Sequence, residues 1–141
     1  FRRVLFRSDG GFDFSSEFNN QEINMSRLIY CQFLTALINQ KIGGTFILKI
    51  FDINYLITNN ILYLLWYYYQ NVTIYKPYTS RIANSEKYII CKGFKHNEVD
   101  ASKMKILFDT LKNCETKEFI NDIFPEFILF ELNFIYISEL V

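Results

Sequence analysis

The chain has 141 residues, of which 50% are hydrophobic, and it carries 15 basic and 15 acidic side chains. This length and apolar content allow one domain, or part of one, with a substantial core, and they exclude a disordered protein. The zero net charge excludes a global basic field, so any nucleic-acid site must come from a local cluster of charge.

The first eight residues stand apart from the rest. The segment 1–8, Phe-Arg-Arg-Val-Leu-Phe-Arg-Ser, resembles the in-frame translation of a sequencing adapter, and we interpret it as non-native. We therefore expect the natural sequence to begin near Asp9 and the chain to be a fragment whose missing part lies upstream.

Turn formers and polar residues fill the stretch from Asp9 to Glu22, which predicts a loop. Apolar residues at helical spacing then predict a helix from about Asn24 to Gln40. A Gly43-Gly44 turn follows, and the next residues, up to Asp52, read as a buried strand.

A second helical pattern runs from Ile57 to Tyr68, and we interpret its aromatic residues as core filling. Two short strands follow, Val72 to Tyr75 and Tyr88 to Cys91, separated by a loop from Lys76 to Ser85. The alternation of strands and helices predicts an α/β sheet with mostly parallel strands.

From His96 onward the sequence shows helical patterns and no further strand. Met104, Leu107, Phe108 and Leu111 predict one amphipathic helix, and 124–137 is a second, very apolar segment. His96 is interpreted as a surface residue rather than a metal ligand or base. We therefore expect residues 96–141 to form a helical extension after the domain at 9–95.

The cysteines, Cys31, Cys91 and Cys114, are odd in number and lack a CxxC spacing. This pattern predicts reduced thiols in an intracellular protein rather than a disulfide framework or a zinc site. The longest apolar run, Ile61 to Tyr69, has nine residues. A membrane-spanning helix needs about 20, so we predict no membrane span.

Lys49 is an unusual residue for the most apolar part of a buried strand. Burial of an unpaired ammonium is unfavourable by several kcal/mol. The side chain must therefore either reach solvent along the surface or have its charge put to use, and the strand pattern alone leaves both options open.

Three ionisable groups converge if the sheet is built as predicted. Ligands of open α/β sheets bind beyond the carboxyl ends of the parallel strands. Asp9 follows one such strand, Lys49 lies near the end of the next, and an antiparallel last strand would bring Glu86 to the same edge.

The loop and the last strand also hold a basic cluster with a single acid, Glu86. A solvated surface and a phosphate-binding surface both fit such a cluster, and the charges alone favour the solvated one slightly. The cluster consists of Lys76, Arg81, Lys87, Lys92 and Lys95.

Several motifs together resemble the C-terminal half of an FtsJ-type (RrmJ-like) ribose 2′-O-methyltransferase. They are most similar to the branch in eukaryotes and large DNA viruses that methylates the first transcribed nucleotide of capped mRNA. The motifs are Asp9-Gly-Gly-Phe, Asn20-Gln-Glu, Gln32-Phe-Leu-Thr-Ala-Leu, the stretch 43–52 and, above all, the stretch 76–94.

The resemblance implies a Rossmann-like class I methyltransferase sheet, mostly parallel with an antiparallel last strand. It also implies a Lys-Asp-Lys-Glu tetrad in which Asp9, Lys49 and Glu86 are the last three members. The first lysine and the main S-adenosylmethionine site would lie upstream, with Asp9 near the cofactor. By the same resemblance, the RNA-contacting residues are Asn19, Asn20, Gln21, Lys76, Arg81 and Asn84. Ile82 departs from the family pattern, which has proline there.

The implied chemistry explains these residue types. A ribose hydroxyl is a poor nucleophile near pH 7, so its attack on a sulfonium methyl group needs a proton acceptor. Lys49 would accept the proton, Glu86 would orient it or the hydroxyl, and Asp9 would lie near the sulfonium. This scheme requires no metal.

Two alternatives stay open at this point. The same chemistry could act on ribosomal or transfer RNA instead of capped mRNA. The chain could also belong to an inactive RNA-binding or scaffold relative, although the presence of Asp9, Lys49 and Glu86 argues against it. We expect the protein in the nucleus or cytoplasm, or in a viral factory if it is viral.

Overall fold

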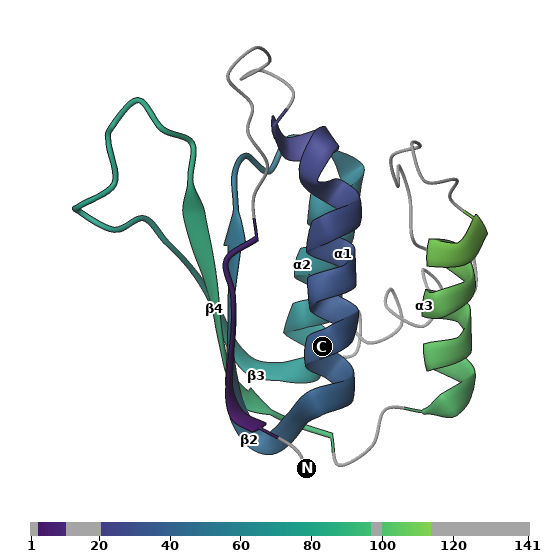
Figure 1. The fold of residues 1–141 in the computed structure, drawn as a ribbon. Coiled ribbons are helices and arrows are strands. Elements are labelled where there is room, and N and C mark those ends of the chain that lie inside the picture. The colour runs from purple at the N-terminus through teal and green to yellow at the C-terminus, as the bar shows by residue number, and fades with distance from the viewer. Residues whose placement is uncertain (1–2, 11–20, 97–99, 114–141) are drawn as a thin grey trace, which may run out of the picture.

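The structure, a computed structural model, describes residues 3–10, 21–96 and 100–113. These residues form four strands and three helices (Figure 1). In chain order the elements are β1 (Arg3–Ser8), α1 (Gln21–Asn39), β2 (Gln40–Ile50), α2 (Leu56–Tyr68), β3 (Tyr69–Tyr75), β4 (Lys87–Phe94) and α3 (Ala101–Asn113).

The four strands form one mixed sheet in the order β1-β2-β4-β3. β1 pairs with β2 in parallel, and β4 pairs in antiparallel fashion with both β2 and β3. β1, β2 and β3 therefore share one direction, and the last strand runs against them. This confirms the predicted α/β class and the antiparallel last strand, whereas the insertion of β4 between β2 and β3 was not predicted.

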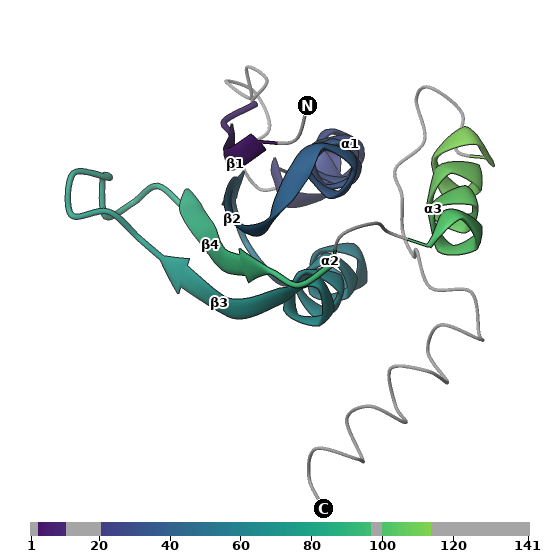
Figure 2. The same cartoon turned by 90° about the horizontal axis from the view of Figure 1, so that it is seen from below.

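The core lies between the sheet and two helices. α1 and α2 cover one face of the sheet, and α3 packs farther out against α1 (Figures 1 and 2). Alternate residues of β2 face the helices and are fully buried, namely Phe46, Leu48 and Ile50. Aromatic side chains of α1, including Tyr30 and Phe33, fill the space above them, as expected for core residues.

α3 has the predicted amphipathic pattern, with one exception. Leu107 is buried, and Met104 and Leu111 pack against the core, but Phe108 is exposed. The Tyr30 hydroxyl donates a hydrogen bond of 2.8 Å to the Leu107 carbonyl and so fastens α3 to α1. The second apolar segment, 124–137, lies outside the described residues.

The Gly43-Gly44 pair lies inside β2, not before it as predicted. Gly43 has a φ of 74°, and a Cβ on Gly44 would lie 2.1 Å from Nε2 of Gln40. That Gln40 amide fills the irregularity by donating to the carbonyls of Val4 and Thr45. The pair therefore forms a bulge that only glycine fits, and the strand begins directly after α1.

Other boundaries differ from the predictions by a few residues. α1 starts at Gln21, so most of the predicted loop lies in residues 11–20, outside the described part. The segment Arg3–Ser8, which we set apart as non-native, forms strand β1. Its origin stays a prediction. Within the described residues, no helix is long and apolar enough to cross a membrane.

Glu22 connects the start of α1 to the start of α2. α2 has no side-chain cap from its own N-cap residue, Tyr55. The Glu22 carboxylate instead accepts hydrogen bonds from the amides of Asn54 and Tyr55, both at 2.9 Å, and from the Thr58 hydroxyl at 2.7 Å. A buried negative charge at a helix N-terminus satisfies unpaired amides and complements the helix dipole.

We predict that Glu22→Ala lowers the free energy of unfolding by about 2–4 kcal/mol, because it leaves three donors without their acceptor. Glu22→Gln should lose less, since it keeps one oxygen and the side-chain volume. Urea denaturation of the chain measures both changes. A loss below about 0.5 kcal/mol for the alanine variant, typical of surface positions, would contradict this role.

Cys31 and Cys91 are free cysteines, and Cys114 lies outside the described residues, so the reduced state of the three thiols stays a prediction. Burial raises the pKa of the Cys91 thiol to about 12. At pH 8 the thiolate fraction of Cys91 is therefore far below that of an exposed cysteine.

We therefore predict that Cys91 resists iodoacetamide at pH 8 in the folded chain and reacts after denaturation. Counting the fast-reacting thiols by mass spectrometry checks this. Cys91→Ala should leave the number of fast-reacting thiols unchanged. If Cys91→Ala has one fast-reacting thiol fewer than wild type, the burial of Cys91 is contradicted.

Candidate active site

Lys49 lies on the sheet face opposite α1 and α2. Its neighbours Leu48 and Ile50 point into the core, and the alternation of side chains along β2 directs Lys49 the other way. Its side chain is 19% exposed. The lysine is therefore neither unpaired in the core nor free in solvent.

Two carboxylates flank the Lys49 ammonium. Its Nζ lies 3.3 Å from Oδ1 of Asp9 and 3.5 Å from Oε2 of Glu86. Asp9 follows β1 and Glu86 precedes β4, so the three groups come from three parts of the chain. The structure thus brings together the triad that the sequence predicted at this edge of the sheet.

Tyr88 is a member of this cluster that sequence analysis missed. Tyr88 pairs with Lys49 across β2 and β4, and its hydroxyl donates a hydrogen bond of 2.7 Å to Oε1 of Glu86. That hydrogen bond, followed by burial, raises the pKa of Tyr88 to about 12. The available signal was the spacing of two residues, which places Glu86 and Tyr88 on one side of an extended chain.

The loop between β3 and β4 projects away from the helices (Figure 1). Its residues Tyr78 and Ile82 are almost fully exposed. Two turns shape it, with hydrogen bonds of 3.0 Å from the Ser80 amide to the Pro77 carbonyl and from the Asn84 amide to the Arg81 carbonyl. Both turns form with isoleucine at position 82, where the family pattern has proline.

The predicted basic cluster divides into separate groups in the structure. Lys87 forms an ion pair of 3.3 Å with Asp52, and Lys95 lies against Trp66 at the far end of β4. Lys92 is exposed on β4, opposite Thr45 and away from the triad. Lys76 lies next to Glu86, and Arg81 lies in the loop between these two residues.

Of the predicted RNA-contacting residues, Lys76, Arg81 and Asn84 lie in the loop next to Glu86. Gln21, the first residue of α1, reaches the same region, since its Oε1 lies 3.5 Å from the Ser85 hydroxyl. Asn19 and Asn20 lie outside the described residues. The structure therefore gathers Gln21, Lys76 and Asn84 at the same edge as Lys49, with Arg81 farther along the loop.

His96 lies apart from the triad, in an aromatic cluster. It stacks on Tyr67 with ring centroids 5.6 Å apart and contacts Tyr68 and Phe94 edge-on. It is half-buried rather than fully on the surface as predicted, and burial lowers its pKa. The described residues contain no group of three or more His, Cys, Asp or Glu that could hold a metal ion.

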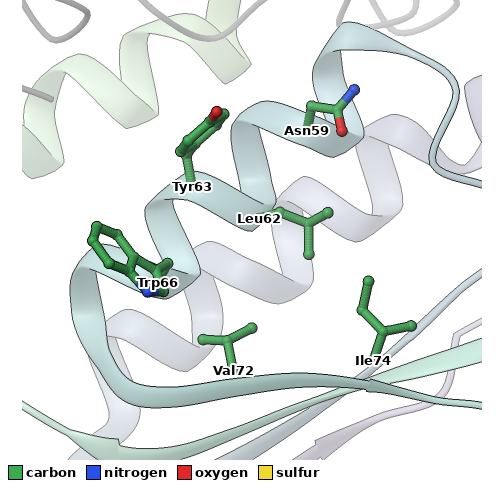
Figure 3. Close-up of a pocket in the computed structure, with 6 residues that line it drawn as sticks. All are labelled: Asn59, Leu62, Tyr63, Trp66, Val72 and Ile74. Carbon is green, nitrogen blue, oxygen red and sulfur yellow. The ribbon is translucent and has the colours of Figure 1, made fainter. Parts of the chain in front are cut away.

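A pocket of about 400 Å³ lies between α2 and β3, where Leu62 faces Val72 and Ile74 (Figure 3). The other lining residues are Asn59, Tyr63 and Trp66. The pocket is apolar and shares no residue with the cluster around Lys49. It therefore does not form part of the candidate active site.

Residues 3–94 match the model of one protein family, described as FtsJ-like methyltransferase. This range contains all four strands, the triad and the loop. The chain belongs to the FtsJ-like methyltransferase family. The matched range begins inside the segment 1–8, at the first residue of β1.

Relatives of known name agree with this assignment. The chain is 36% identical over 142 residues to cap-specific mRNA (nucleoside-2′-O-)-methyltransferase 1 of Caenorhabditis elegans, covering 97% of this chain and 15% of the relative. It is 46% identical over 88 residues to the Danio rerio protein of the same name, covering 62% of this chain and 11% of the relative. The chain therefore spans only a small part of these relatives.

A solved structure shows the same fold. It is a ribosomal RNA methyltransferase from Plasmodium falciparum, with a TM-score of 0.51 and 25% sequence identity. The match covers 66% of this chain and 47% of that one. The mixed sheet described above is thus an FtsJ-type sheet.

Proposed function

We propose that this chain is the C-terminal half of a catalytic domain that transfers a methyl group from S-adenosylmethionine to the ribose 2′-OH of RNA. The substrate that we favour is the first transcribed nucleotide of capped mRNA. The observation that carries the proposal is the placement of Lys49 between Asp9 and Glu86 in an FtsJ-like fold. We call the longer protein that contains the upstream half the complete enzyme.

Lys49 is the proposed proton acceptor. Lys49, in its neutral amine form, would accept the proton of the 2′-hydroxyl as the 2′-oxygen attacks the methyl group that bound S-adenosylmethionine would supply. Glu86 holds Nζ of Lys49 with one carboxylate oxygen while Tyr88 binds the other. The amine is thereby oriented, which favours in-line alignment of the reacting atoms.

Asp9 fits a cationic cofactor. Its carboxylate is 43% exposed, with Oδ1 at 3.3 Å from Nζ of Lys49 and Oδ2 at 3.2 Å from the guanidinium of Arg7, which belongs to the segment that we interpret as non-native. When bound, S-adenosylmethionine supplies an electrophilic methyl group on a sulfonium. Asp9 is the residue of this chain that would lie near it, and the remaining contacts would come from upstream residues.

The loop residues and the start of α1 form the proposed RNA-binding edge. Asn19, Asn20, Gln21, Arg81 and Asn84 would lie along the substrate near the reacting nucleotide, with Lys76 at the base of the loop. Arg81 supports this best, because its guanidinium makes no hydrogen bond or ion pair with the residues that the structure describes. A free guanidinium can bind a phosphate with two donors.

The capped substrate rests on the names of the relatives, which are cap-specific mRNA methyltransferases. The structural match to a ribosomal RNA methyltransferase favours the second candidate, the same chemistry on ribosomal RNA. Methylation of matched capped and uncapped RNAs by the complete enzyme would separate the two. Faster reaction with the uncapped RNA would favour the second candidate.

We predict that Lys49→Met and Lys49→Arg both abolish methyl transfer in the complete enzyme. Methionine has no proton acceptor, and a guanidinium keeps its proton at neutral pH. Loss of general-base help alone lowers the rate by about 10²- to 10⁴-fold. Single-turnover methylation of capped RNA measures this effect.

Cofactor affinity and melting temperature serve as controls for the Lys49 variants and should stay close to wild type. A purely structural lysine predicts the opposite pattern, with arginine tolerated and any defect traced to a lower melting temperature. Near wild-type turnover by Lys49→Arg would remove Lys49 as the base.

We predict that Arg81→Ala weakens RNA binding and lowers the slope of log affinity against log salt by roughly one, the value for one lost phosphate contact. Titration of the complete enzyme with RNA at several salt concentrations measures the slope. The matched control is Lys92→Ala, which removes an exposed charge from β4 far from the triad. An unchanged slope for Arg81→Ala would identify Arg81 as a solvated residue.

A further inference from the structure

Lys76 stands where the ladder between β3 and β4 ends. The last pair of that ladder is Tyr75 with Tyr88, so Lys76 and Glu86 both lie just outside the sheet, on the two stems of the loop. The Lys76 side chain crosses between these stems. Its ammonium donates to the carbonyl of Asn84 and, at 3.5 Å, to the carbonyl of Glu86.

Glu86 depends on such contacts because no strand holds it. β4 starts one residue later, at Lys87, which pairs with Ile50. The Glu86 amide donates a hydrogen bond of 3.0 Å to the side chain of Asn84, and its carbonyl accepts from Lys76. With Tyr88 on Oε1, these contacts leave Oε2 of Glu86 directed at Lys49.

We propose that Lys76 is a positioning residue that closes the base of the loop and holds Glu86 against Lys49. Its consequence for catalysis rests on the proposed function. The ammonium donates to carbonyl oxygens of its own loop, so Lys76 differs from the RNA-contacting lysine that the resemblance implies. The Asn84 side chain helps to close the base of the loop, and Arg81 is the remaining loop cation that would bind RNA.

The substitutions separate this role from phosphate binding. Lys76→Met keeps much of the stem and removes the donors, whereas Lys76→Arg keeps donors that can reach two carbonyl oxygens. For Lys76→Met we expect a saturated single-turnover rate about 10- to 100-fold lower, as for a misplaced catalytic group, with unchanged RNA affinity and salt slope. Lys76→Arg should restore most of the rate. Lys92→Met is the matched control and should change neither the saturated rate nor the RNA affinity with its salt slope.

A second measurement does not depend on methylation. Hydrogen exchange of the loop and of the Glu86 amide should be faster in Lys76→Met than in wild type or Lys76→Arg. If the wild-type complete enzyme fails to methylate any RNA, the proposed function fails while the exchange experiment still tests the closure. Unchanged exchange in Lys76→Met would overturn the proposal, and so would a salt slope lowered by about one at an unchanged saturated rate.

Discussion

The antiparallel pairing of β2 with β4 is the constraint on which the site depends. It sets Lys49 opposite Tyr88 and ends at the pair of Ile50 with Lys87, so that Glu86 emerges beside the lysine. Side chains alternate between the two faces, and a slip of one residue in either strand would exchange their core and outer residues. The fully buried side chains of Leu48 and Ile89 oppose such a slip. The same core contacts that stabilise the sheet therefore fix the geometry of the proposed base.

The position of Asp9 is set by the backbone pairing of the preceding strand, not by the side chains of the residues before it. Ser8 pairs with Leu48 in the parallel ladder, which places Asp9 next to Lys49. Any extended segment that ends in this register would deliver the aspartate to the same point. The contribution of Asp9 is thus independent of whether residues 1–8 are native, although its ion pair with Arg7 is not.

The triad could be predicted from the sequence because each of its three members has a recognisable position in or next to a predicted strand. Lys49 interrupts an apolar strand, and Asp9 and Glu86 flank strands whose ends meet at one edge.

The roles of Glu22 and Lys76 could not be predicted from such a sequence pattern. Their partners are backbone groups of other segments, the start of α2 and the end of the loop, and no periodicity marks such contacts. The Gly43-Gly44 pair was recognised as a break, but its bulge involves the Gln40 amide of the same strand, which donates to Val4 on β1 and to Thr45.

Lys49 and Lys76 show how the surroundings decide what a lysine does. Lys49 is held by carboxylates on a sheet face that no described helix covers, where the proposed substrate would approach it. Lys76 faces carbonyl oxygens, which carry no proton equilibrium near neutral pH and require only a donor. Arginine can therefore replace a lysine that bridges carbonyl groups, but it cannot replace one that must accept a proton. The response of each position to arginine is thus a chemical signature of its role, independent of how strongly each position affects the rate.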